Sequence, residues 1–458
     1  MKKTLALLLL LAGLNLGVWG ETLTWNGSEG HMTWNFEDDN WLQGDTPAQY
    51  IDGNDVVFGY TGCGTVTLSD TLEPASVKVG PSNDYTFTGD GKLTGKMKLT
   101  IDNSKLTVNT ANDYTGGTII KPGSTLVVGN DKALGTGAVT LDRAATLDLG
   151  GHVLSNDVVT VTSSGNICCI GNGTLNGNIS LASNTILQLI GNLSGTGRIT
   201  LGDNMVLDLG GCTLSNSVTL QGSASIRGGG TLSGDLTVGE GLTFSLDNPE
   251  IVSGTIYLGK KSTLDLRGNT LNTNVVLTRG AATITAGTLN GNISVSVDKF
   301  LHLGGDLKGA GTIVLEDHGY LYLEGHTLST HVAIQGSEAY IGDGTLNGDL
   351  YVRAGARLKL VYRNMQGSGV ITLGDNATLQ LGGIIDLTLS NRVILEGSAT
   401  IGYGTLDGSI SVGANNKLTL LEKTTITGAI NLGDHAALDL GGNTIHLDGE
   451  DGNKLVLN

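Results

Sequence analysis

The sequence is poor in proline and in aromatic residues. Of its 458 residues only 5 are Pro and 4% are aromatic, whereas 72 are Gly. A chain of this length would commonly form two or three globular domains, but this composition instead indicates many short strands joined by tight turns. Positive charge is also scarce, because 26 Lys and Arg stand against 43 Asp and Glu, a formal net charge of -17. This excess repels phosphate groups, which excludes nucleic acid and anionic lipid as partners.

Long apolar runs are confined to the start of the chain. Residues 1–20, MKKTLALLLLLAGLNLGVWG, begin with Lys2 and Lys3, continue with an apolar run and end with small residues. This pattern is typical of a secretory signal peptide, and we expect cleavage after Gly20. No later apolar run reaches about 18 residues, so no membrane-spanning helix is expected. The mature chain, starting near Glu21, is predicted to be secreted or held at a bacterial cell surface.

Cysteine is rare, with four residues at Cys63, Cys168, Cys169 and Cys212. An even number in an exported protein is compatible with disulfides, but the spacing defines no disulfide framework. Alignment of the repeats described below places Cys168 at a small, inward-facing position and Cys169 at an outward-facing one. Packing cysteines are favoured. A disulfide stays open, and the absence of C-x2-C spacing argues against a metal site.

Internal repetition is the strongest feature that the sequence does contain. The segment G-T-L-[NSD]-G recurs with a period of about 57 residues, rising to about 60 residues in the last interval, at Gly173, Gly230, Gly287, Gly344 and Gly404. Within each unit apolar and polar residues alternate, as in ITLGDNMVLDLGG from Ile199. A period of two indicates strands with one buried face. One third of a unit, about 20 residues, matches one coil of a parallel β-helix.

These patterns predict an all-β fold, a single-stranded right-handed parallel β-helix (solenoid) of about 18 coils with an N-terminal cap. Asn and Asp in the turns are expected where positive φ is needed, at Asn176-Gly177, Asp203-Asn204, Asn290-Gly291 and Asp407-Gly408. The cap is expected to contain the aromatic residues Trp25, Trp34, Trp41, Phe36, Phe58 and Phe87. The expected divisions are a signal peptide at 1–20, the cap at 21–95, a repeat at 96–151, five of the longer repeat units at 152–447, and a C-terminal tail or cap at 448–458.

The segment NDYTGGTIIKPGSTLVVGNDKALGTGAVTLDRAATLDLGG, residues 112–151, resembles the autotransporter-associated β-strand repeat of passenger-type exported proteins. The similarity is carried by Y-T-G-G-T from Tyr114, G-S-T-L from Gly123, A-L-G from Ala133 and L-D-L from Leu147. It implies a β-helical passenger that is displayed at, or released from, the cell surface and is often adhesive. The chain departs from that pattern because it ends without a recognisable C-terminal membrane barrel or anchor, so we expect no self-translocation.

Motifs for a metal or cofactor are absent. The sequence has no calcium-binding nonapeptide, P-loop, G-x-S-x-G elbow or H-E-x-x-H helix. Acids recur at one repeat position, at Asp148, Asp208, Asp265 and Asp439. Copies in adjacent units would lie three coils apart, on the order of 14 Å, which is too far for a shared calcium shell. No metal and no cofactor are therefore expected.

The least repetitive chemistry lies between Glu316 and Asp343. Glu324 and Asp343 are separated in the sequence by the length of one coil, so they are expected on successive coils. Glycoside cleavage uses such carboxylate pairs, which makes these two acids weak candidates for catalysis. Tyr320, Tyr322, Tyr340 and Tyr362 offer a candidate ligand face on which sugars could stack. A more polar copy of an ordinary repeat explains the same residues and stays open.

The sequence therefore favours a non-enzymatic structural or adhesive surface protein that binds through an extended face. The expected partners are glycans, host or matrix components, or neighbouring surface proteins. One alternative is a β-helix polysaccharide hydrolase or lyase, which the acids near Glu324 would serve. Another is a scaffold that self-associates end to end through an open C-terminal coil.

Overall fold

The fold is a parallel β-solenoid. The computed structural model describes residues 21–27, 31–161, 166–247, 251–382, 387–443 and 455–457, and throughout these ranges the regular structure is strand, with no helix. The strands form about 19 turns of solenoid, which confirms the predicted fold class. None of the described residues lies in a helix long and apolar enough to cross a membrane. The expected signal peptide, 1–20, lies outside the described residues and stays a prediction. The chain divides into two compact units, Met1–His152 and Val153–Asn458.

An antiparallel region begins the first unit. Strand β3 (Trp41–Gln43) pairs antiparallel with both β1 (Thr22–Trp25) and β4 (Thr46–Ala48). Parallel pairing starts where β1 meets β5 (Asp55–Phe58), and it continues from β5 to β8 (Ser76–Val79). At this end of the first unit β3 therefore runs against the direction of the coils, whereas β1 and β4 run with it.

Aromatic side chains fill this antiparallel region. Trp25, Trp34, Trp41 and Phe58 are fully buried, whereas Phe36 remains 38% exposed. The ring centroids of Trp25 and Trp41 are 4.9 Å apart in an edge-on arrangement, and those of Trp34 and Phe58 are 5.4 Å apart. Such pairs add about 0.5 to 1.5 kcal/mol each beyond the burial of their area. This region is the cap of the predicted fold.

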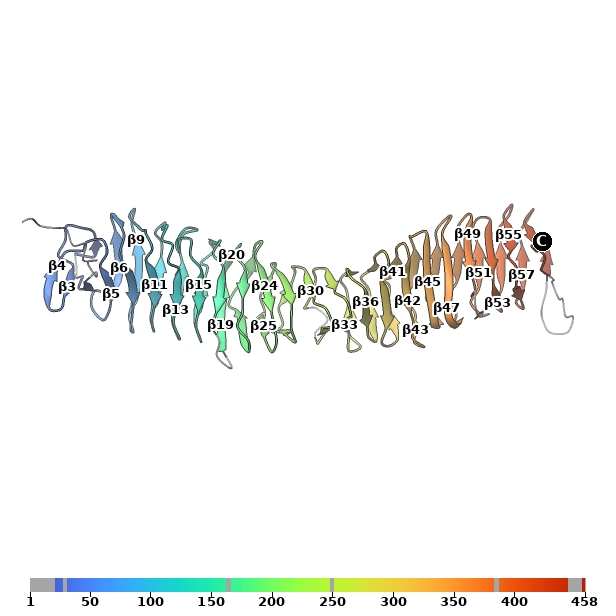
Figure 1. Ribbon diagram of the computed structural model, residues 1–458, viewed down its shortest axis with the longest axis horizontal. Helices are drawn as coiled ribbons and strands as arrows, with labels where there is room; N and C mark the ends of the chain where they lie inside the picture. The colour runs from blue at the N-terminus through green and yellow to red at the C-terminus, as the bar shows by residue number, and fades with distance from the viewer. Residues whose placement is uncertain are drawn as a thin grey trace, which may run out of the picture. The chain divides into compact units, whose positions relative to one another are not determined.

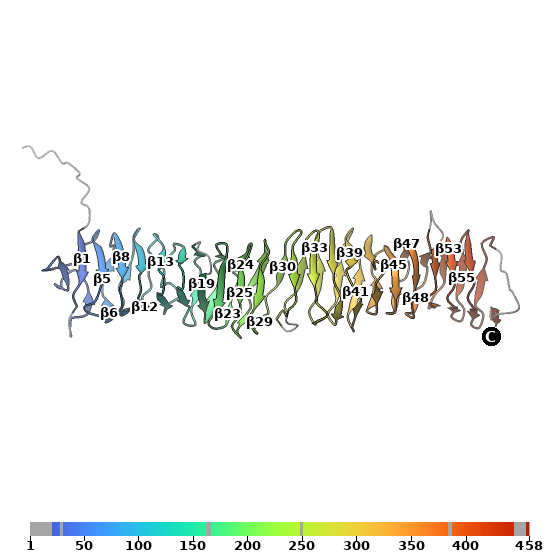
Figure 2. The same ribbon diagram turned by 90° about the horizontal axis from the view of Figure 1, so that it is seen from below.

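The second unit shows the length of one coil directly. In the parallel ladder formed by β32 (Ile256–Leu258), β35 (Val275–Leu277), β38 (Ile293–Val295) and β41 (Thr312–Leu315), the first aligned residues are Ile256, Val275, Ile293 and Ile313. These partners follow one another at about one third of the repeat period, so three coils make up each repeat unit. Figures 1 and 2 show the strands of this unit stacked coil upon coil.

Alternation along each strand separates the core from the surface. The aligned Leu, Ile and Val residues are buried, while the Thr, Ser and Asn residues between them are half-buried. Cys168 in β19 (Asn166–Gly171) is fully buried, as are its repeat counterparts Ala282 and Ala339. Cys169 is half-buried, with its Sγ 3.9 Å from Gln188 Oε1. The predicted inward and outward placement of this pair is confirmed.

Positive φ was predicted at four turns, and the structure contradicts this prediction at three of them. Asn204 adopts the expected left-handed conformation, with φ 57°. Gly177, Gly291 and Gly408 do not, and a Cβ on them would lie 1.9, 2.0 and 2.0 Å from a backbone carbonyl oxygen of the preceding coil. Glycine is needed at these three turns because adjacent coils approach too closely for a side chain. The prediction of positive φ at these three Asx-Gly pairs was therefore wrong.

The last described strand, β59 (Leu455–Leu457), pairs parallel with β57 (Ile430–Leu432). It belongs to the segment 448–458, for which a C-terminal tail or cap is expected, and residues 448–454 lie outside the described part of the chain. The described end of that segment thus extends the parallel ladder by one strand.

Candidate functional site

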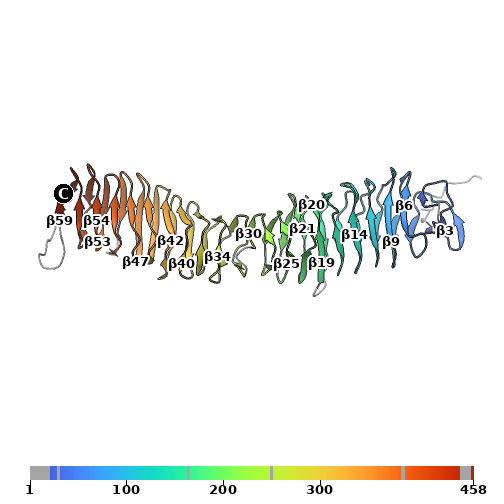
Figure 3. The ribbon, with the colours of Figure 1, turned by 180° about the vertical axis from the view of Figure 1, so that it is seen from behind.

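Four strands of the second unit carry the candidate residues. They are β39 (Phe300–Leu303), β42 (Gly319–Tyr322), β45 (Glu338–Leu346) and β47 (Arg357–Gln366), and each pairs parallel with the next. Figure 3 shows β42 and β47 in the same stack as β40 (Leu307–Lys308). Because the alternating Leu and Ile residues of these strands point inward, the residues between them form outward-facing columns that run from coil to coil.

The first column is a stack of aromatic rings. Phe300, Tyr320, Tyr340 and Lys359 are register partners on successive strands. The ring centroids of Phe300 and Tyr320 are 4.6 Å apart with planes at 23°, and those of Tyr320 and Tyr340 are 4.2 Å apart at 5°. The Nζ atom of Lys359 lies 5.3 Å from the Tyr340 centroid, a cation–π contact. Both ring faces of Tyr320 and Tyr340 are therefore covered by neighbours.

The second column runs beside this stack and includes a glycine. It runs from His302 to Tyr322, then to Gly342 and Val361. His302 lies against one side of Tyr322, with centroids 4.8 Å apart. On the other side Gly342 contributes no side chain, and a Cβ there would lie 2.4 Å from the carbonyl oxygen of Val361. The face of Tyr322 toward Gly342 is consequently left uncovered by the column itself.

A bulge in β47 places new side chains beside Tyr322. The pairing of β45 with β47 shifts register between Gly342 and Gly344, so that Asp343 alone faces Tyr362, Arg363 and Asn364. Bulges of this kind redirect side chains away from the regular alternation. The Tyr362 ring is 63% exposed and meets the Tyr322 ring edge-on, with centroids 5.4 Å apart.

Three residues around the bulge have left-handed backbones. Glu324, Asp343 and Tyr362 have φ angles of 52°, 62° and 74°. Glu324 stands in the turn where other units carry glycine, for example Gly150 and Gly441, which share its positive φ. Non-glycine residues in this conformation carry a backbone cost, and such residues cluster at functional sites. The equivalent residues of other units share this conformation, Arg267 for Glu324 and both Asn172 and Tyr403 for Asp343, so only the left-handed backbone of Tyr362 is particular to the bulge.

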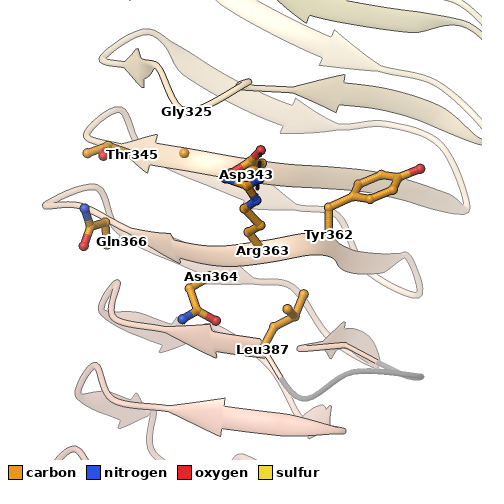
Figure 4. Close-up of a pocket in the computed structure, with 9 residues that line it drawn as sticks. Gly325, Asp343, Thr345, Tyr362, Arg363, Asn364, Gln366 and Leu387 are labelled. Atoms are coloured by element: carbon orange, nitrogen blue, oxygen red, sulfur yellow. Dashed lines mark ion pairs between the residues drawn. The ribbon is translucent and has the colours of Figure 1, made fainter.

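Two contiguous pockets result. One, of about 380 Å³, is lined by His302, Tyr322, Glu324, Asp343, Tyr362 and Arg363. The other, of about 520 Å³, is shown in Figure 4 and is lined by Gly325, Asp343, Gly344, Thr345, Tyr362, Arg363, Asn364, Gln366 and Leu387. Hereafter they are the aromatic pocket and the amide pocket. They share Asp343, Tyr362 and Arg363, and each has a volume typical of small-molecule sites.

The charged groups of the pockets face one another. His302 Nδ1 lies 2.8 Å from Glu324 Oε1, and Arg363 Nε lies 3.9 Å from Asp343 Oδ2. Figure 4 shows Asp343 and Arg363 pointing toward each other across adjacent strands. The cationic side chain of Arg363 is thus opposed by a carboxylate within the same site.

Ionisation of the nearby tyrosines is suppressed. Burial, followed by a hydrogen bond to Tyr362, raises the pKa of Tyr322 well above its ordinary value. Burial is also the main cause of the raised pKa values of Tyr320 and Tyr340. The neutral hydroxyls of Tyr320 and Tyr322 are hydrogen-bonded to Tyr340 and Tyr362.

A charged cluster borders the aromatic stack. Glu338 forms an ion pair with Lys359, and its Oε2 is 3.6 Å from His318 Nε2. Partial burial opposes the ionisation of Glu338, but the hydrogen bond and charge of Lys359, with Arg357 and His318, outweigh it and hold the pKa of this carboxyl below its ordinary range. This cluster anchors the end of the stack and does not line either pocket.

The structure divides the residues singled out from the sequence into two groups. Glu324, Asp343, Tyr322 and Tyr362 line the aromatic pocket together. Tyr320 and Tyr340 belong to the aromatic stack, where both ring faces are occupied, so their faces are closed to a stacked sugar.

Sequence reasoning missed His302, Gly342 and Arg363. One signal for the region existed, because the interval from Gly344 to Gly404 is longer than the intervals between the preceding copies of the same segment. His302 was detectable from its register, one coil before Tyr322. Both pockets are lined by residues of the bulge in β47, which no sequence pattern located.

Metal ligands do not gather in the described ranges, which contain no group of three or more His, Cys, Asp or Glu able to hold an ion. Cys63 is exposed and Cys212 half-buried, both as free thiols.

Comparisons with known proteins add no relative, since no family model, curated protein or solved structure matches the chain. The fold and the geometry of the two pockets are therefore the basis for any functional conclusion.

Proposed function

We propose that this protein is an exported bacterial surface or extracellular β-solenoid that binds glycans through the aromatic and amide pockets. The observation that carries the proposal is the lining of these pockets: two partly open tyrosine rings beside carboxylate, guanidinium and amide groups. Aromatic rings bury the apolar faces of sugars, and planar polar side chains hydrogen-bond the hydroxyls around them. The framework positions these groups on rigid strands, so little ordering is required on binding.

Two features of the sequence support an external, adhesive role. Residues 1–20 have the pattern of a signal peptide, and residues 112–151 resemble the autotransporter-associated β-strand repeat of surface-displayed passengers. Passenger proteins of that kind are often adhesive, and an adhesin requires a binding site on a durable scaffold. A parallel solenoid with a closely packed core provides such a scaffold.

The test is a glycan and extracellular-matrix array probed with the mature protein from Glu21. We expect saturable binding that Tyr362→Ala weakens about tenfold or more, equivalent to about 1.4 kcal/mol. The substitution should leave the fold intact because the ring is 63% exposed. Tyr351→Ala is the matched control, since Tyr351 is 41% exposed and lines neither pocket. Equal binding by wild type and Tyr362→Ala would contradict the proposal.

A second candidate function is polysaccharide cleavage. It is favoured by one observation, the placement of Glu324 and Asp343 in the same pocket, with His302 hydrogen-bonded to Glu324. A carboxylate pair flanking a glycosidic bond is the requirement for hydrolysis. The binding proposal expects no released oligosaccharide when the protein is incubated with a polysaccharide that it binds. Release that Glu324→Gln and Asp343→Asn both abolish would establish the enzyme instead.

A further inference from the structure

The two pockets together extend over five successive coils. His302, Tyr322, Gly342 and Val361 are register partners on four of them, and Met365 of β47 pairs with Leu389 of β50 (Leu387–Leu389) on the fifth. Four spacings between parallel strands amount to on the order of 19 Å. Tyr362, Asp343 and Arg363 lie at the junction and belong to both pockets. The site is therefore long in the direction of coil stacking and is continuous across its middle.

The one Arg of the lining is already opposed by a carboxylate. Arg363 faces Asp343 at 3.9 Å, and His302 is hydrogen-bonded to Glu324 at 2.8 Å. No other Lys or Arg lines either pocket. A sulfate or uronate group would therefore meet the carboxylates of Glu324 and Asp343, and the one guanidinium, that of Arg363, is already paired with Asp343. A polyanionic ligand would also approach a chain with a net charge of -17. Both facts disfavour acidic glycans.

The remaining lining suits hydroxyl groups. Thr345, Asn364 and Gln366 present hydroxyl and amide groups in the amide pocket, and Tyr322 and Tyr362 present rings in the aromatic pocket. Amides and hydroxyls both donate and accept hydrogen bonds, as sugar hydroxyls do. The two pockets thus offer ring stacking at one end and hydrogen bonding at the other, with Tyr362 between them.

On these grounds, and resting on the proposed glycan-binding function, we infer that the ligand is an uncharged oligosaccharide several sugar units long that lies along the stacking direction of the coils and occupies both pockets at once. A monosaccharide fills only part of the site. An acidic oligosaccharide of equal length is disfavoured by charge.

The inference is tested by calorimetric titration of the mature protein with gluco-, manno-, galacto- and xylo-oligosaccharides, each from monosaccharide to hexasaccharide, beside an oligogalacturonate series. We expect at least one uncharged series to gain about tenfold or more in affinity from monosaccharide to hexasaccharide, and the acidic hexasaccharide to bind at least about tenfold more weakly. A monosaccharide that binds as tightly as its hexasaccharide, or tighter binding of the acidic series, would overturn the inference while leaving glycan binding in place. Absence of binding by every series and by the glycan array would overturn the proposed function itself.

A pair of variants tests the use of both pockets. His302→Ala alters the aromatic pocket alone, and Gln366→Ala alters the amide pocket alone. Each should weaken the hexasaccharide several-fold, whereas a disaccharide should lose affinity in only one of the two variants. If only one variant affects the hexasaccharide, the ligand occupies a single pocket and the inference is wrong. Thermal unfolding of both variants should match wild type, which separates loss of contact from loss of fold.

Discussion

Single residues decide whether the site exists. Gly342 stands between Tyr322 and Val361 in the second column and brings no side chain against either residue, and β47 bulges directly after Val361. Tyr362, which lies two coils after Tyr322, meets the Tyr322 ring edge-on. Tyr320 and Tyr340 are of the same residue type and lie close by, yet neighbouring side chains cover their ring faces. Residue identity alone therefore did not distinguish a ligand face from a packed stack.

Gly342→Val should remove ligand binding and lower stability by about 1 to 3 kcal/mol, because overpacked side chains force the neighbouring backbone to shift. The new Cβ would lie 2.4 Å from the carbonyl oxygen of Val361. Urea unfolding measures the stability, and the glycan array measures the binding. Gly59→Ala is the control: a Cβ there meets nothing within 4 Å, so its stability should stay within about 0.5 kcal/mol of wild type. A stable Gly342→Val variant that binds normally would show that the close approach of β45 and β47 at Gly342 is not needed for the site.

Acid should destabilise the second unit partly through Asp265. A hydrogen bond from Thr285, with further contributions from Arg267, outweighs desolvation and lowers the pKa of this carboxyl below its ordinary value. Since the unfolded chain takes up the proton first, the stabilisation is present above the ordinary Asp pKa of about 3.9 and is lost as pH falls toward the lower folded value. Urea unfolding across a pH series should give a shallower acid-side decline for Asp265→Asn. An identical decline in the variant and the wild type would refute this role.

At the scale of strands and coils, most of the architecture was predictable. Alternation with a period of two predicted the buried faces, and the spacing of the repeated segment predicted three coils per unit, because both follow from local geometry that repeats. The bulge in β47 was not predictable, since it depends on how the whole strand Arg357–Gln366 aligns against β45. The turn glycines were misread for a related reason. Glycine is required at these turns because the backbone of the preceding coil lies too close for a side chain, and sequence spacing does not reveal this contact.

Buried asparagines provide a second link between coils. Asn391 donates from Nδ2 to the carbonyl oxygens of Leu346 and Gly369, at 2.9 and 2.8 Å. Asn391→Leu should cost about 1 to 3 kcal/mol, since the carbonyl of Gly369 loses this donor and the carbonyl of Leu346 keeps only the N–H of Gly369. Thr330 occupies the same repeat position, is fully buried, and its Oγ1 has no hydrogen-bond partner. Thr330→Val should therefore be neutral or stabilising, and denaturant unfolding that ranks the two variants in the opposite order would contradict this account.

At the scale of the whole molecule, two compact solenoid units of one chain combine a repetitive framework with one irregular region. Repetition stabilises through contacts between neighbouring coils and carries no information about a ligand. The departure from repetition between β39 and β50 is where aromatic, acidic and amide side chains meet at an open surface. A durable framework with one specialised region suits a protein that works outside the cell.

Export is testable independently of binding. When the full chain is produced in a Gram-negative bacterium, the mature form should leave the cytoplasm and begin at Glu21, because residues 1–20 have the features of a cleavable signal peptide. N-terminal sequencing together with fractionation of the cells measures both outcomes. A cytoplasmic protein that retains residues 1–20 would contradict the extracellular role.

The most direct test of the central claim is a crystal structure of the mature protein with the uncharged hexasaccharide that binds it most tightly. We predict sugar density over both pockets, in contact with Tyr322, Tyr362 and Asp343, and lying along the direction in which the coils stack. Sugar bound on another face of the solenoid, with these residues untouched, would contradict the assignment of the site.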